Sequence, residues 1–482
     1  MRVKLVLLFA CLVLLAGCAA ETPGQTDPVV ETTAPIEQLT MVVTEETLLH
    51  LEEYTQLKRL DLTGSTCYSA IARYMQAHPR VDVTYTVELE TVTVGNKETY
   101  LVLDPSACSY ETLAENLAYL PRLETVYMPL CEYTPDQMIA LVGMYPDIRW
   151  SYSVVFLGQE LTQDMTALNL SVLTPEQVST AVSVLHLFPK INQAELMDTQ
   201  GESLLGLADV KALLEGAPHV DFHYTFSLFG QTVSTKDTAL EFVGQDLGSD
   251  ALTRLREALD VLPVGTRVLL DNCGLENEDL ALLRADYPDR EIVWRVFVGK
   301  NSWLTDTETI RANGILNDAN ASVLGYCTQV RYADLVHNHD LTDISFLSKM
   351  PGLEILLLSG CPVTDLTPLE GSAALRCLEL AYCESLEELS PLALCKNLAY
   401  LNLSYTKVTD LAVLEDKPLR QLYAVVSVIP WSEQNRLQTA KPDCWFRFDG
   451  SQAYGTGWRY EKTGMPTDIY KELCAIFGYQ EN

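Results

Sequence analysis

The chain has 482 residues, of which 48% are hydrophobic and 9% aromatic, so it is long enough to bury a large core and is not disordered throughout. Its 65 acidic residues outnumber 33 Lys and Arg and give a formal charge of −32. Such an acidic surface repels phosphate backbones, which excludes nucleic acid as an expected partner.

The N-terminus predicts a processed leader. Arg2 and Lys4 precede an apolar run from Leu5 to Leu15, which is shorter than the ~20 residues that span a bilayer. Leu15-Ala16-Gly17-Cys18 follows, and it resembles the lipobox of bacterial lipoproteins. The alternative is an ordinary signal peptide with an accidental cysteine.

The lipobox resemblance implies cleavage before Cys18 and acylation of its sulfur, with acyl chains such as palmitate. Two such chains are enough for stable anchoring. We therefore predict a signal peptide over residues 1–17 and a lipid anchor with a flexible tether over residues 18–38, a stretch rich in Thr, Pro and Glu. The expected location is the cell membrane, with the folded part on the extracytoplasmic side.

Residues 39–329 contain diverged repeats of about 70 residues. Similar segments recur around Pro79, Pro146, Pro218 and Pro288, and each continues into an alternating apolar stretch. The pattern predicts a unit of strand, hairpin, strand, helix, strand and helix, with hairpin turns at positions such as Gly158.

A shorter repeat occupies residues 330–427. Leu353-x-x-Leu356-x-Leu358-x-x-Cys361 is followed by equivalent runs that begin at Leu375 and Leu398. This pattern resembles the leucine-rich repeat, and its spacers are similar to those of bacterial internalin-type repeats. The resemblance implies that each L-x-L is a short parallel strand whose x positions face a concave surface.

The predicted fold is therefore α/β: a leucine-rich-repeat solenoid with a curved parallel sheet, β-hairpin insertions in its N-terminal two-thirds and a C-terminal cap over residues 428–482. The cap is expected to hold a strand from Cys444, a glycine-rich loop and a helix from Thr467, and to cover the core of the last repeat. Three or four separate α+β domains are the alternative.

Most of the 13 cysteines are expected to be packing residues. Apart from Cys11 and Cys18, eleven remain, an odd number that excludes complete pairing within one chain. Four of them occupy the last position of the repeat pattern, where a small inward side chain fits: Cys131, Cys273, Cys361 and Cys383. Cys377 differs, because it holds an x position and should face the concave surface.

No catalytic motif is present, and we expect no cofactor. His219 and His223 lie on a predicted strand, too far apart along it for one metal ion. His337, His339 and Asp340 follow a strand and leave a metal site open as a possibility.

The concave face carries the most coherent binding signal, because tyrosines mixed with acids and amides make good contact surface. The candidate ligand-binding residues are Tyr332, Asp334, Glu379, Tyr382, Tyr400, Asn402, Tyr405 and Tyr423. Other x positions include Ile355, Leu357 and Gln421.

The sequence thus favours a membrane-anchored binding protein, not an enzyme, that recognises a protein, peptide or envelope polymer. The alternative is an envelope enzyme such as a carboxylate-based glycan hydrolase. That alternative requires two carboxylates that converge in a pocket about 5–9 Å apart.

Overall fold

The structure, a computed structural model, describes residues 36–104 and 106–480. The predicted signal peptide, Cys18 and most of the tether lie outside these residues. No helix in the described part of the chain combines the length and the apolar character that a membrane span requires. The chain forms two compact units, which divide between Phe156 and Leu157.

Unit 1 is built from short parallel strands whose middle residues point into the core. In one sheet, Leu101, Val126 and Trp150 are in register on adjacent strands, and all three are buried. The elements are β1 (Gln38–Thr40), α1 (Glu45–Leu49), η1 (His50–Glu53), β2 (Arg59–Asp61), α2 (Tyr68–Ala77), β3 (Asp82–Thr84), β4 (Thr86–Leu89), β5 (Val92–Gly95), β6 (Tyr100–Val102), α3 (Tyr110–Asn116), η2 (Leu117–Tyr119), β7 (Thr125–Cys131), α4 (Pro135–Met144) and β8 (Arg149–Phe156).

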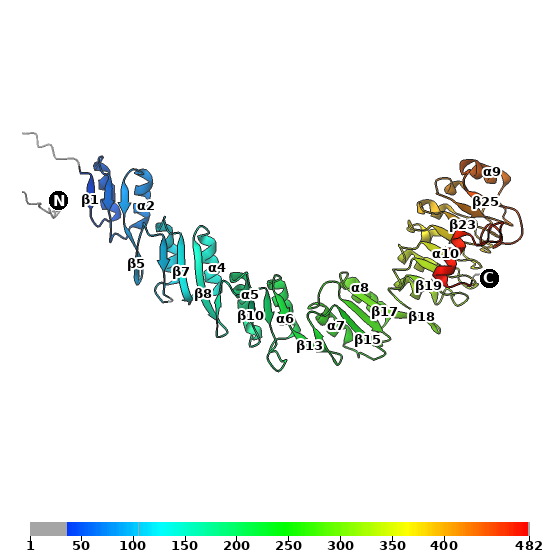
Figure 1. Cartoon of the computed structure of the whole chain (residues 1–482), viewed down its shortest axis with the longest axis horizontal. Coiled ribbons are helices and arrows are strands. Elements are labelled where there is room, and N and C mark those ends of the chain that lie inside the picture. The colour runs from blue at the N-terminus through cyan, green and yellow to red at the C-terminus, as the bar shows by residue number, and fades with distance from the viewer. Residues whose placement is uncertain (1–35, 105, 481–482) are drawn as a thin grey trace, which may run out of the picture. The chain divides into compact units, whose positions relative to one another are not determined.

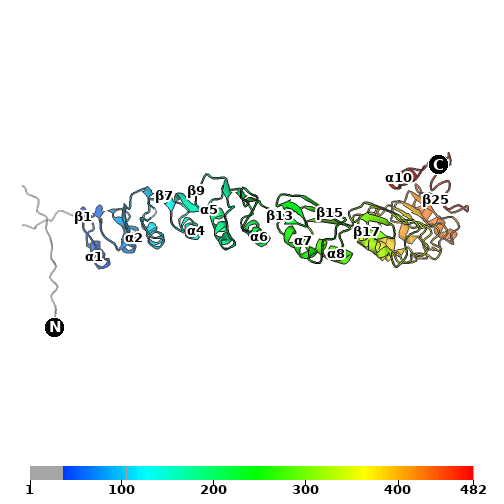
Figure 2. The same ribbon diagram turned by 90° about the horizontal axis from the view of Figure 1, so that it is seen from below.

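The first part of unit 2 repeats this plan, with helices α7 and α8 on one side of the β15–β18 sheet (Figure 2). Its elements are β9 (Gln159–Thr162), β10 (Ala167–Asn169), η3 (Pro175–Gln177), α5 (Val178–Leu187), β11 (Gln193–Glu195), α6 (Leu207–Gly216), β12 (Asp221–His223), β13 (Thr225–Leu228), β14 (Gln231–Ser234), β15 (Ala239–Val243), α7 (Ala251–Leu259), β16 (Arg267–Asp271), α8 (Asn277–Asp286), β17 (Glu291–Val298) and β18 (Asn301–Leu304). The predicted order of strand, hairpin, strand, helix, strand and helix is confirmed in β3 to α4.

A recurring buried polar contact fixes the hairpins to the sheets. The backbone N–H of Tyr224 donates to the Thr235 hydroxyl, and that of Trp294 donates to the Thr305 hydroxyl, both at 3.2 Å. In unit 1 the N–H of Tyr85 donates to the Asn96 side chain at 3.1 Å. Tyr85 and Tyr224 directly follow the third parallel strand of their sheets, and Trp294 lies within the third strand, β17, so the same bond satisfies the backbone where the chain passes from sheet to hairpin.

The regular repeats form one seven-stranded parallel sheet, β19 to β25. The inward column Leu356, Leu378 and Leu401 is in register and fully buried. The elements are β19 (Thr309–Arg311), η4 (Ala321–Tyr326), β20 (Tyr332–Asp334), η5 (Ser345–Lys349), β21 (Ile355–Leu357), η6 (Thr367–Leu369), β22 (Cys377–Glu379), η7 (Ser390–Leu394), β23 (Tyr400–Asn402), η8 (Ala412–Leu414), β24 (Gln421–Tyr423), α9 (Trp431–Ala440), β25 (Trp445–Arg447) and α10 (Asp468–Phe477). The core is continuous across the predicted boundary between residues 329 and 330.

The last position of the repeat supports the turning backbone, as expected. Asn338 donates to the carbonyls of Ala312 and Leu335. The Cys361 thiol also reaches the Leu335 carbonyl, at 3.1 Å, and Cys383 reaches that of Leu358. Burial raises the pKa of Cys361 to about 11. The packing role predicted for these thiols is confirmed, and all eleven cysteines in the described part of the chain are free.

The C-terminal residues have two roles, and only one resembles the predicted cap. Helix α9 and strand β25 complete one further coil, because β25 pairs in parallel with β24. The rest, residues 450–480, turns back and places α10 against one face of the β19–β25 sheet (Figures 1 and 2). We call residues 450–480 the C-terminal segment. Gly457 permits the turn, because its φ is 101° and any side chain there would overlap the Trp445 ring.

Candidate functional site

The face of the β19–β25 sheet that bears the x positions is covered by the C-terminal segment. Its apolar x positions Ile355, Leu357 and Cys377 are buried against Leu473 and Phe477 of α10. These contacts remove from water a row of side chains that would otherwise be exposed, and this burial favours docking of the helix.

Hydrogen bonds in both directions connect the C-terminal segment with residues predicted to bind a ligand. The Tyr479 hydroxyl donates to Asp334, and the Trp458 indole donates to Glu379 at 2.7 Å. Asn402 donates to the Ala453 carbonyl at 2.9 Å. Tyrosine hydroxyls make two further bonds, from Tyr405 to the Ser451 carbonyl and from Tyr423 to the Gln452 carbonyl.

An ion pair between Arg376 and Glu472 holds α10 against the sheet. Arg376, which precedes β22, donates to both oxygens of Glu472 on α10, and its Nη1–Oε2 distance is 2.9 Å. Arg376 also contacts Glu354 at 3.1 Å. A bidentate guanidinium–carboxylate pair sets orientation as well as adding attraction, so it fixes α10 in one register.

The expectation that the predicted residues face an open concave surface is therefore wrong for part of the set. Asp334, Glu379, Asn402 and Tyr423 are buried. Tyr332, Tyr400 and Tyr405 are half-buried, and Tyr382, where the chain leaves β22, is 38% exposed and stacks on Tyr405 with ring centroids 4.5 Å apart. The pattern marks a contact surface, but in this structure the chain's own C-terminus occupies it.

Glu379 is a buried acid, and loss of solvation on burial raises its pKa. A raised folded-state pKa gives stability that is present below the unfolded pKa and lost as pH rises through the folded value. We expect Glu379→Gln to keep contacts to Trp458 and Ser359 without a buried charge. The variant should be more stable than the wild type at about pH 8, because it removes the cost of keeping a charge at this buried position.

The measurement is the thermal midpoint between about pH 8 and pH 5, where the advantage should shrink as wild-type Glu379 gains its proton. Glu388→Gln is the matched control, because Glu388 is exposed. An advantage that grows toward low pH would show that Glu379 is held as a carboxylate.

An open groove lies on the β10–β12 sheet, upstream of the regular repeats. Its volume is about 730 Å³. Register places the outward side chains in two rows across the three strands: Ala167, Gln193 and Asp221 in one row, and Asn169, Glu195 and His223 in the other. Gln159 and Lys236 complete the lining from the neighbouring hairpins. We call this lining the β10–β12 groove.

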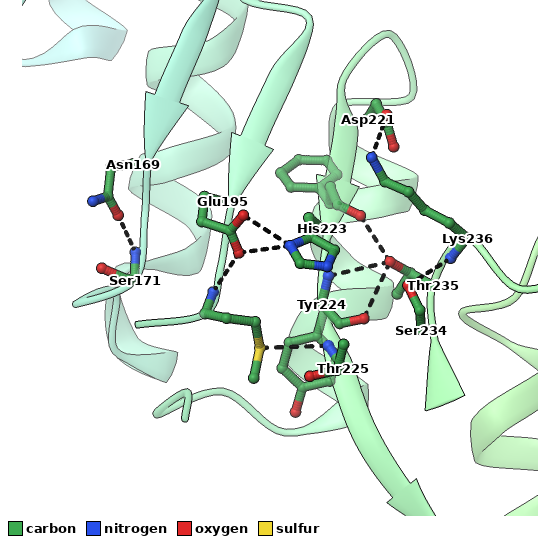
Figure 3. Close-up of polar contacts among 12 residues, drawn as sticks. Asn169, Ser171, Glu195, Asp221, His223, Tyr224, Thr225, Ser234, Thr235 and Lys236 are labelled. Atoms are coloured by element: carbon green, nitrogen blue, oxygen red, sulfur yellow. Dashed lines mark hydrogen bonds and ion pairs between the residues drawn. The ribbon is translucent and has the colours of Figure 1, made fainter. Parts of the chain in front are cut away.

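Two polar pairs organise the groove (Figure 3). His223 Nδ1 lies 2.9 and 2.8 Å from the two Glu195 oxygens, which leaves Nε2 for other contacts. Lys236 Nζ is 2.7 Å from Asp221. Both members of the His223–Glu195 pair are well exposed, at 42% and 44% of their side chains. A ligand on this face therefore meets a histidine, two acids, an amine and amides without any displacement of the chain.

The sequence did not predict this groove. His223 was identified only as a strand residue, and its partner Glu195 is distant in sequence. The available signal was the outward positions of β10, β11 and β12, which hold five polar residues and one alanine, whereas β21 carries the large apolar Ile355 and Leu357 at both of its outward positions. Only the second arrangement exposes large apolar side chains that favour a cover.

The histidines show no metal arrangement. The rings of His337 and His339 have centroids 6.2 Å apart. Within residues 36–104 and 106–480, no group of three or more His, Cys, Asp or Glu side chains is placed to hold a metal ion. His219 lies near His186, with ring centroids 6.0 Å apart.

No protein-family model matches the chain, and neither does any curated protein sequence. Among solved structures, it is similar to internalin C2 of Listeria monocytogenes (19% identity, TM-score 0.25, 29% of this chain and 70% of that one). It is also similar to a second internalin of that species (14%, 0.28, 75% and 86%) and to a leucine-rich-repeat protein of Leptospira interrogans (14%, 0.28, 82% and 90%). All three TM-scores are low, so the leucine-rich-repeat character of this chain rests on its own strand register and leucine column.

Proposed function

We propose that the protein is a membrane-anchored, extracytoplasmic binding protein that recognises a protein, peptide or envelope polymer through the β10–β12 groove. The observation that carries the proposal is the open double row of polar side chains on adjacent strands. Parallel strands lie about 4.8 Å apart, so each row offers evenly spaced hydrogen-bonding groups. Such a row is better suited to a ligand that is a polar chain than to a ligand with an apolar surface.

The anchor part of the proposal rests on the lipobox-like Leu15-Ala16-Gly17-Cys18. Replacing Cys18 with alanine should abolish metabolic labelling by an acyl analogue and release the protein from membranes or leave it unprocessed. Labelling that persists in the variant would remove Cys18 as the attachment site.

A binding role is favoured over a carboxylate-based hydrolase by the state of the two buried acids of the β19–β25 sheet. Asp334 and Glu379 lie two strands apart under the C-terminal segment, and each accepts hydrogen bonds from that segment. Asp334 also accepts from Asn313, and Glu379 from Ser359. Their oxygens thus accept hydrogen bonds within the fold and are not free to act as the acid and base of a hydrolase.

The groove is tested by capturing the partner from the native envelope with the soluble Ala19–Asn482 form and measuring its affinity for variants. Glu195→Lys reverses a charge in the groove and breaks the pair with His223. We expect it to weaken binding at least about tenfold, or about 1.4 kcal/mol, because it replaces a hydrogen-bond acceptor of the groove with a cation. Glu388→Lys reverses an exposed charge elsewhere and should bind like the wild type.

One combination of results would contradict the groove assignment. If Glu195→Lys binds normally while Tyr382→Ala loses the partner, the ligand-binding surface is the one predicted on the regular repeats. Tyr382 suits this comparison because it is the most exposed of the eight predicted residues.

A further inference from the structure

A second cavity, of about 280 Å³, lies between the C-terminal segment and the β19–β25 sheet. Its walls include Glu379 and His337 from the repeat side, and Arg459, Tyr454 and Tyr470 from the segment. Ligand pockets usually have volumes of about 300–1,000 Å³, so this one has the size for a small molecule only.

Arg459 is poised to bind an anion. Its guanidinium carbon lies 4.5 Å from the centroid of the Tyr454 ring and 5.4 Å from that of Tyr470. The two rings hold the planar guanidinium through its faces. Its N–H groups lie in the plane and therefore remain able to donate hydrogen bonds to a ligand. Among the described residues, no carboxylate forms an ion pair with it; Glu379 feels its charge only through space. A half-buried guanidinium without an ion pair is suited to a carboxylate ligand.

Asn313 provides the complementary group. Its Oδ1 is buried and has no hydrogen-bond partner among the described residues. Its Nδ2 donates to the Asp334 carboxylate at 2.9 Å, which distinguishes the nitrogen from the oxygen of the amide, and Asn313 lines the cavity. A buried acceptor without a partner is unfavourable by about 1–3 kcal/mol, and a ligand donor would satisfy it.

We propose that this cavity binds a small molecule that carries one carboxylate and a separate hydrogen-bond donor, the chemistry that amino acids and hydroxy acids share. The carboxylate binds Arg459, and the ammonium or hydroxyl donates to Asn313 Oδ1. The ligand joins the C-terminal segment to β19–β25, because Arg459 belongs to the segment and Asn313 follows β19. This site is distinct from the β10–β12 groove and does not depend on its function.

The test uses the full chain, with isothermal titration of the twenty L-amino acids and of L-lactate. We expect at least one to bind and to raise the thermal midpoint by a few degrees, since a ligand that binds only the folded state stabilises it. For the best amino acid, the amide and the analogue without its α-amino group should each bind at least about tenfold more weakly, because each lacks one of the two groups. Comparison of the amino acids with L-lactate shows whether the ligand's hydrogen-bond donor is an ammonium or a hydroxyl group.

Variants assign the contacts. Arg459→Gln should weaken binding at least about tenfold and Asn313→Ala severalfold. Arg420→Gln, at an exposed arginine, should bind like the wild type and controls for the change in net charge. Absence of binding for every probe up to about 10 mM, or equal affinity for wild type, Arg459→Gln and Asn313→Ala, would overturn the proposal. Two variants from opposite walls keep the test valid if one of them fails to fold.

Discussion

Replacing Trp458 with alanine is expected to destabilise unit 2 by about 3–5 kcal/mol, the range for removal of a buried aromatic side chain. Trp458 is 1% exposed and packs among Tyr423, Ile469 and Leu473. The change also leaves Glu379 without its indole donor, which adds an unsatisfied buried group. The measurement is the denaturant midpoint of unit 2, followed by near-ultraviolet circular dichroism.

The matched control is Trp431→Ala. Trp431 is 76% exposed, so its loss should change stability by no more than about 0.5 kcal/mol. If both variants unfold at the wild-type midpoint, Trp458 does not hold the C-terminal segment on the sheet.

Leu378→Ala is expected to lower stability by about 2–5 kcal/mol through a different mechanism. Leu378 is fully buried in the column between Leu356 and Leu401, so its removal leaves a cavity inside the stacked coils. In a repeat protein each coil is stabilised mainly by its neighbours, and the cavity therefore weakens two interfaces at once.

Leu394→Ala is the control for this change, because Leu394 is 60% exposed on η7. Thermal unfolding of the two variants measures the difference. Equal midpoints would mean that the leucine column is not the core of the regular repeats.

The regular repeats could be predicted because their structure is encoded locally. The spacing of Leu353, Leu356 and Leu358 places one inward residue in β21, and the next coil repeats it in register. The 70-residue units were predictable for the same reason, since alternation and turn glycines such as Gly158 mark the later hairpins, although the β4–β5 hairpin turns at Glu90 without a glycine. The repeat spacing also predicted which cysteines point inward, and Cys361 and Cys383 are buried as expected.

The covering of the sheet face could not be read from local patterns, because it joins residues about a hundred positions apart. Arg376 and Glu472 illustrate the distance in sequence. A signal was nevertheless present: Ile355 and Leu357 are apolar at positions that solvent would face, and Ile469, Leu473 and Phe477 recur every four residues, the spacing of one helix face. Apolar x positions that the repeats alone would leave in solvent, together with an amphipathic helix in the predicted cap, indicate that the helix covers this face of the sheet.

The β10–β12 groove was missed for a related reason. Asn169, Glu195 and His223 become neighbours only when three strands are aligned, and the diverged repeats did not fix that register from sequence. The sequence analysis used tyrosines on the concave face to identify a binding surface. The β10–β12 groove is instead lined by acids, amides and a histidine.

The most direct test of the account is the relative rate at which Cys377 and Cys383 are alkylated in the native protein, read by mass spectrometry of the labelled peptides. Cys377 lies on the outer face of β22 beneath the C-terminal segment, whereas Cys383 points into the core. Burial raises the pKa of both thiols. We predict that both react at similar rates, at least about tenfold more slowly than half-buried Cys67, because each requires local opening. Rapid labelling of Cys377 at the rate of Cys67, with Cys383 still protected, would show that the face is open and would contradict the account.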